Sequence, residues 1–108
     1  MAQDFKRYGE QDVGTSAVTI HTSNSNDAII PIRLANITTS TISVDVYLRR
    51  SSANYYLIKN APIVIGGSLE LIDGGSKIVL ASGDQLYVES DTASSLDTVV
   101  GAVDAIST

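Results

Sequence analysis

The sequence contains one histidine, His21, and no cysteine, so few of its residues could carry catalytic or metal chemistry. One histidine without thiols cannot form a histidine-rich or cysteine-rich metal centre. His21 could act as a general base beside a serine, but no serine lies in a nucleophile-elbow context. The sequence therefore favours His21 as a polar-face residue at a strand end. It predicts no catalytic residue, no enzyme activity and no small-molecule substrate.

Four carboxylates lie close together in the sequence near the C-terminus: Asp84, Glu89, Asp91 and Asp97. Acids on adjacent loops could share a proton or bind calcium, because hard cations prefer oxygen ligands. Calcium loops place their acids at alternate positions, however, and no such series occurs here. We expect solvated loops, with a cation site near Asp84–Asp97 as the alternative, and we predict neither a metal nor another cofactor.

Tyrosine and arginine side chains are better candidates for function, because both types are enriched in protein–protein contacts. If one face of the segment 42–49 packs on a core, Tyr47 and Arg49 point outward. Cross-strand packing on a solvated sheet face is the alternative, and a carbohydrate platform is a third, although a sugar platform more often carries tryptophan. The predicted protein-contact residues are Phe5, Arg7, Tyr8, Tyr47, Arg49 and Tyr55.

Alternation of apolar and polar residues predicts the strands that must position these side chains. The clearest case is 42–49, where Ile42, Val44, Val46 and Leu48 alternate with polar residues or tyrosine. A polar turn and the segment 55–58 follow, which predicts a hairpin. Turn signals recur every eight to twelve residues or so, a spacing typical of sandwiches and barrels. We predict an all-β fold: a compact antiparallel β-sandwich, jelly-roll or Ig-like, of about eight short strands.

Three segments refine this prediction. Pro31 cannot donate to a strand ladder, which predicts that its strand lies at an edge or begins there. GGSLELI (66–72) and GGSKIVL (74–80) form a near-repeat, in which each glycine pair predicts a turn before a short strand rather than a phosphate-binding loop. The segment 96–106 fits either a strand or a helix. Its valines and Gly101 favour the strand.

Length and charge limit the remaining possibilities. A chain of 108 residues predicts one domain, which we place at residues 13–108 after an extended N-terminal arm at 1–12. The arm is either a frayed terminus or a segment whose aromatic residues dock on a neighbouring subunit. The net charge of −5, with scattered basic residues, predicts no nucleic-acid partner. No apolar run approaches the ~20 residues that a membrane span needs, and the first twelve residues do not read as a signal peptide.

Several motifs together resemble a known family. The opening FKRYGEQDVGTS, the central ISVDVYL and the long stretch from YYLIKNAPIVIGGSLELIDGGSKIVL to SSLDTVV are similar to small β-sandwich virion structural proteins of tailed bacteriophages, especially T4-like phages of marine cyanobacteria. The resemblance covers most of residues 5–105. Its motifs consist mainly of turn and core residues, and it transfers no functional residue to this chain.

The resemblance implies a non-catalytic structural subunit of a phage virion, made in the host cytoplasm. A head decoration or cement protein is the first expectation, followed by a neck or tail accessory protein. Its expected partners are further copies of itself, as a homo-oligomer, and a major capsid, neck or tail protein. The alternative is a host-surface or carbohydrate-binding module of a tail fibre or baseplate.

Overall fold

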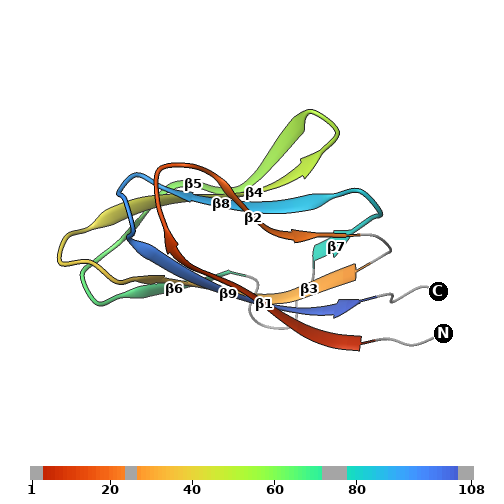
Figure 1. Cartoon of the computed structure of the whole chain (residues 1–108), viewed down its shortest axis with the longest axis horizontal. Helices are drawn as coiled ribbons and strands as arrows, with labels where there is room; N and C mark the ends of the chain where they lie inside the picture. Colours follow the sequence, from red (N-terminus) through yellow and green to blue (C-terminus); the bar gives the residue numbers. More distant parts are fainter. Residues whose placement is uncertain (1–3, 24–26, 72–77, 105–108) are drawn as a thin grey trace.

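The computed structural model describes residues 4–23, 27–71 and 78–104, which form two antiparallel sheets packed face to face (Figure 1). The predicted all-β sandwich is therefore confirmed. Nine strands lie within the described residues, and three of them have ten or eleven residues, longer than expected. No described helix is long and apolar enough to cross a membrane.

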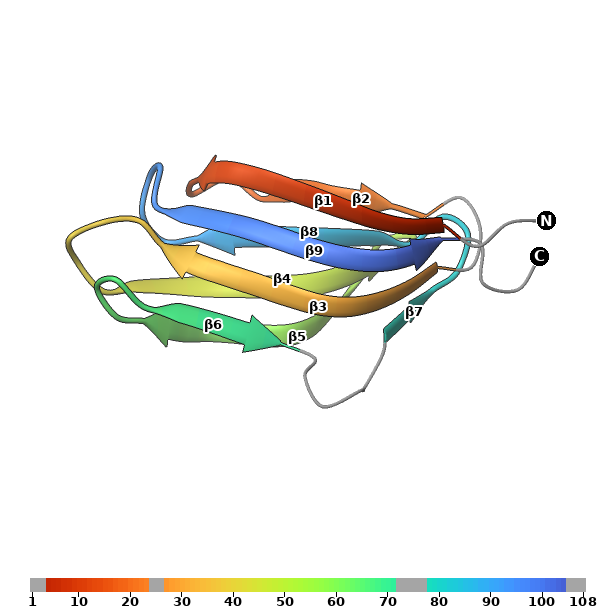
Figure 2. The same cartoon turned by 90° about the horizontal axis from the view of Figure 1, so that it is seen from below.

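The first sheet contains five strands. Its order is β1-β9-β3-β6, and β7 also pairs with β3 (Figure 2). These strands are β1 (Asp4–Val13), β3 (Asp27–Asn36), β6 (Ser68–Leu71), β7 (Ile78–Leu80) and β9 (Leu96–Asp104). The second sheet has the order β2-β8-β4-β5 and contains β2 (Val18–Thr22), β4 (Ile42–Arg50), β5 (Ala53–Ile63) and β8 (Gln85–Ser90).

This strand order selects the jelly roll over the Ig-like alternative. Strands from opposite ends of the chain are neighbours: β1 pairs with β9 in one sheet, and β2 pairs with β8 in the other. The chain therefore wraps its first and last strands together around the middle strands, as in a double-sheet jelly roll. The strand favoured for 96–106 is confirmed as β9 over its described part, and the β4–β5 hairpin is confirmed as well.

Aliphatic side chains from both sheets fill the space between them. The predicted core face of β4 is buried, with Ile42, Val44 and Val46 at most 1% exposed. Val88 of β8, Val100 of β9 and other aliphatic residues of the neighbouring strands pack into the same cluster. The χ1 angle of a β-branched side chain is already restricted, so such a side chain loses little rotamer freedom when it packs on a pleated sheet. These residues therefore suit both the strands and the core.

The expectation that Pro31 marks an edge strand is wrong, because β3 is central. It pairs with β9 on one side and with β6 and β7 on the other. Proline is tolerated because the β3–β9 register shifts between Ile29 and Ile32, and a bulge needs no ladder bond at that position. On the side of β3 away from β9, the pairing strand also changes at this point: β7 pairs with Asp27–Ile29 and β6 with Ile32–Ala35.

This interruption explains the near-repeat in the sequence. Each copy of the motif supplies one short strand, and both short strands pair with the same strand, β3. The first turn is built as predicted, since Gly66 has a φ of 67°. The second glycine pair, Gly74-Gly75, lies outside the described residues.

The N-terminal segment is not a separate arm over its described residues. β1 pairs with β9 from Asp4↔Asp104 to Val13↔Leu96, so it forms an edge of the sandwich itself. The sequence pattern hid this strand because its residues are mostly polar and its register shifts between Glu10 and Val13, where Asp12 has a φ of 57°.

Gly101 provides a direct test of the bulge in β3. A Cβ atom at Gly101 would lie 2.8 Å from Cδ and 3.0 Å from Cγ of Pro31. We expect Gly101→Ala to lower the free energy of unfolding by about 1–3 kcal/mol, the usual cost of overpacking. Urea unfolding monitored by circular dichroism measures this change.

Two further variants make the test specific. Gly9→Ala is the control, because its added Cβ would meet one backbone oxygen at 3.3 Å, and it should cost less. Adding Pro31→Ala to Gly101→Ala should recover part of the lost stability. Equal costs for the Gly9 and Gly101 variants would contradict the proposed contact.

Candidate functional site

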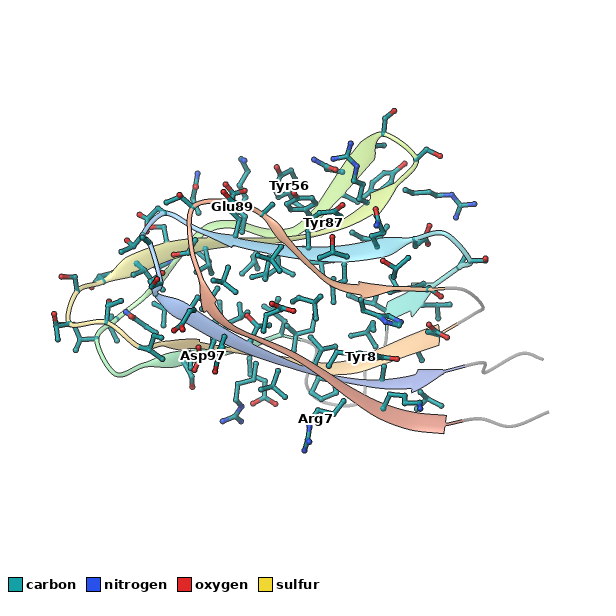
Figure 3. The ribbon with its side chains drawn as sticks, in the orientation of Figure 1. Arg7, Tyr8, Tyr56, Tyr87, Glu89 and Asp97 are labelled. Atoms are coloured by element: carbon teal, nitrogen blue, oxygen red, sulfur yellow. The ribbon has the colours of Figure 1, made fainter. Side chains whose placement is uncertain are left out.

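Three tyrosines form a row across the outer face of the second sheet. Tyr47 of β4 stands directly opposite Tyr87 of β8 and Tyr56 of β5 in the strand register. We call Tyr87, Tyr47 and Tyr56 the tyrosine row. Figure 3 shows Tyr56 and Tyr87 pointing away from the core on this face.

The rings of the tyrosine row pack against one another. Tyr47 and Tyr87 are parallel, with centroids 5.2 Å apart and 1° between their planes, and Tyr56 lies tilted at 5.0 Å on the other side. Tyr47 is only 6% exposed although it points away from the core. The Nζ atom of Lys59 lies 4.3 Å from the centroid of the Tyr56 ring, a cation–π contact. The row is thus a fixed surface with one end capped by a cation.

Burial changes the chemistry of the central tyrosine. Desolvation raises the pKa of Tyr47, and the nearby carboxylate of Glu89 raises it further. Both effects disfavour the phenolate, the first because a charge loses hydration and the second because two negative charges repel. Tyr47 therefore keeps its proton at pH values at which an ordinary tyrosine side chain has lost it.

Charged residues flank the tyrosine row on both sides. Toward the β4–β5 turn, Arg49 lies opposite Gln85 and Asn54. In the other direction Asp45 lies opposite Glu89, and its Oδ1 accepts a hydrogen bond of 2.7 Å from the backbone N–H of Asn60. The face therefore carries Arg49 on one side of the aromatic rings and Asp45, Glu89 and Lys59 on the other, which suits polar and aromatic contact with another protein.

The predicted contact residues do not form one cluster. Tyr47 and Arg49 lie on the outer face of the second sheet, and Tyr55 is 57% exposed on β5. Arg7 is exposed on the outer face of the first sheet, on the opposite side of the molecule (Figure 3). Phe5 pairs with Val103 in β1, but its side chain lies outside the described residues. Tyr56 and Tyr87 complete the site, and the cross-strand register was the signal that could have identified them.

The side chain of Tyr8, another predicted contact residue, points between the sheets. Tyr8 packs against the core, and its ring stacks on His21 with centroids 4.1 Å apart. The expectation of His21 on a polar face is wrong. Its side chain is 8% exposed, and its Nε2 lies 2.8 Å from Oδ2 of the buried Asp27.

A bulge accounts for the inward direction of His21. The β2–β8 register shifts between Thr19, which lies opposite Tyr87, and His21, which lies opposite Leu86. Ile20 is therefore an extra residue on β2 with no residue of its own opposite it on β8. Ile20 and His21 are both buried, against the alternation that the sequence pattern assumed. The one histidine is thus held by a carboxylate and an aromatic ring inside the sandwich.

The four C-terminal carboxylates are dispersed by the fold. Glu89 and Asp97 lie on opposite outer faces (Figure 3). Oδ2 of Asp84 accepts from the Ala81 N–H at 2.9 Å, and Oδ1 of Asp91 accepts from the Ser43 N–H at 3.1 Å. The hydrogen bond from Ser43 lowers the pKa of Asp91, because it stabilises the carboxylate. Within residues 4–23, 27–71 and 78–104, no group of three or more His, Cys, Asp or Glu side chains could hold a metal ion.

Comparison with protein-family models, with curated proteins and with solved structures finds no match to this chain.

The raised pKa of Tyr47 predicts a loss of stability at alkaline pH. The unfolded chain releases this phenolic proton near pH ~10 while the folded chain retains it, so the stabilisation is complete below that pH and is lost as the pH rises through the folded-state pKa. We expect Tyr47→Phe to show a smaller alkaline loss of unfolding free energy than the wild type in urea titrations. Tyr55→Phe, at an exposed ring, is the control and should follow the wild type. An unchanged pH dependence in Tyr47→Phe would contradict this assignment.

The His21–Asp27 pair predicts a large stability cost when one partner is removed. Asp27→Ala leaves His21 buried without its carboxylate and should lower the unfolding free energy by about 2–4 kcal/mol. The matched control is Glu70→Ala, which breaks the exposed Arg33–Glu70 pair of 2.6 Å. Such surface pairs contribute about 0–1 kcal/mol. Thermal and urea unfolding of both variants should separate them, and similar losses would count against the buried pair.

Proposed function

We propose that this chain is a non-catalytic structural subunit that acts through protein–protein packing. The observation that carries the proposal is the tyrosine row on the outer face of the second sheet. Tyr47 is locked between Tyr87 and Tyr56, and Lys59 covers one end. Contact with a surface that is already ordered costs little side-chain entropy, because aromatic side chains have few rotamers to lose.

The expected setting of this subunit is a tailed-phage particle, as its sequence resemblance implies. A jelly-roll fold agrees with that setting by analogy alone, since the same fold serves viral capsid and lectin domains. On a symmetric lattice each copy repeats the same contact, so modest contacts suffice for stable attachment. Head decoration is the first proposed position, and a neck or tail accessory position is the second.

A carbohydrate-binding module is the weaker alternative. Sugar rings stack on open aromatic faces, whereas Tyr47 is buried between its neighbours and one face of Tyr56 lies under Lys59. Tyr55 is the most exposed aromatic ring among the described residues. Binding to a glycan array that is lost in Tyr55→Ala would favour this alternative over the structural role.

Copy number in purified particles tests the proposed function directly. Quantitative mass spectrometry should find this chain in intact particles after density-gradient purification. A copy number that follows the head lattice would indicate decoration, and one that follows the portal or tail symmetry would indicate a neck or tail position. Absence from intact particles would contradict the proposal.

The outer face makes a second prediction at the level of a side chain. Tyr87→Ala removes one end of the tyrosine row and should weaken attachment to particles about tenfold or more, as expected when a contact aromatic is truncated. Val99→Ala is the control, because Val99 is 47% exposed on the other sheet. Sedimentation of folded variants with purified particles measures attachment. Equal attachment of both variants would exclude the tyrosine row as the contact surface.

A further inference from the structure

The edges of the two sheets differ in how well they resist pairing with another strand. An unprotected edge offers free backbone N–H and C=O groups to any other strand, so natural edges are usually short, charged or bulged. β1 carries the charged residues Lys6, Arg7 and Glu10 and a bulge near Asp12. β2 has five residues and a bulge, while β6 and β7 have only four and three residues.

The first half of β5 is neither short nor charged, although its pairing with β4 shifts register between Val46 and Tyr47. β5 is eleven residues long and pairs only with β4. Residues 53–58, with the sequence ANYYLI, contain no charge, no proline and no glycine. Charge and proline follow only after this segment, with Lys59 and Pro62, and Asn60 has a φ of 54°. Short uncharged segments of high β-propensity are those most prone to add to another strand.

This segment is also accessible. Tyr55 is 57% exposed and Tyr56 is 44% exposed, and the end of the β4–β5 hairpin rises clear of the other strands (Figure 1). Another sheet edge can therefore approach without displacing any described strand. A long, uncharged edge on a protruding hairpin is an interaction surface in a molecule whose other described edge strands are short or charged.

We propose that residues 53–58 of β5 pair antiparallel with the same segment of a second copy of this chain, across a two-fold axis. This inference rests on the proposed function for the premise that the chain assembles. A two-fold interface brings a surface against itself, so the surface must be self-complementary. An uncharged segment meets this condition, because no like charges oppose one another within residues 53–58 in either antiparallel register.

The tyrosine row selects the register. With Tyr56 opposite Tyr56 of the second copy, the rows of the two molecules become continuous across one joined sheet. Aromatic residues directly opposite each other stabilise antiparallel pairs. Lys59 then lies opposite Ala53, and in each copy its Nζ atom lies over the Tyr56 ring. In this register residues 53–59 of one copy lie opposite residues 59–53 of the other, and a pairing of this length buries less area than a standard interface of about 1,600 Å², so we expect a reversible dimer.

Sedimentation velocity over a range of concentrations provides the first test. The wild type should show a reversible monomer–dimer equilibrium. Tyr55→Lys places a charge on the edge and should weaken the dimer about tenfold or more. Val79→Lys is a closely matched control, because Val79 is 56% exposed on β7 and lies outside the proposed interface. Its dimerisation should equal that of the wild type.

A cysteine placed at the two-fold axis provides the second test, and the chain has no cysteine of its own to interfere. Directly opposed residues have Cβ atoms about 5 Å apart, close to the separation that a disulfide spans. Tyr56→Cys should therefore form a covalent dimer on mild oxidation, whereas Val79→Cys at the same concentration should remain largely monomeric. This variant also keeps the question open to test if Tyr55→Lys fails to fold.

The outcomes separate this inference from the proposed function. A monomeric wild type together with no disulfide in Tyr56→Cys would overturn the β5 pairing. A dimer that is equally strong in both lysine variants would also overturn it. In either case, attachment to particles that depends on Tyr87 would leave the proposed function standing, because Tyr87 lies on β8 and not on the β5 edge.

Discussion

Packing of aliphatic side chains in one dry interior is the constraint on which this structure depends. Each strand of a two-layer sandwich must turn its apolar residues toward the other sheet, because burial of that surface is the main favourable term in folding. Once Val44 and Val46 face inward, Tyr47 must face outward and meet the residues opposite it on β5 and β8. The tyrosine row is therefore a consequence of core packing.

Departures from strict alternation determine where the polar chemistry goes. The bulge in β2 turns His21 inward, where Asp27 and Tyr8 hold it. The bulge in β3 accommodates Pro31 in a central strand, and Gly101 on β9 leaves room for the proline ring. In both places a residue that appears reactive or disruptive in the sequence takes part in the packing of the sandwich.

The surfaces left after packing are two outer faces and the edges of the sheets, and they suit different contacts. The tyrosine row offers ordered aromatic rings with charged residues on both sides, so it suits attachment to a larger partner. The first half of β5 offers free backbone groups without charge, so it suits pairing with a like strand. A face and an edge on the same sheet can act together, since a dimer formed through β5 would present two tyrosine rows to one partner and gain from avidity.

The sequence by itself determined the fold class and the clearest strands, because period-two burial is local: the β4–β5 hairpin follows from alternation and turn residues, and the valines and Gly101 favoured the strand at 96–104. Only the tertiary structure decided the rest. The jelly-roll order, the edge position of β1 and the central position of β3 depend on pairings between distant segments, which no local pattern encodes. The inward direction of His21 was likewise hidden, since a bulge of one residue reverses the face of every side chain that follows it.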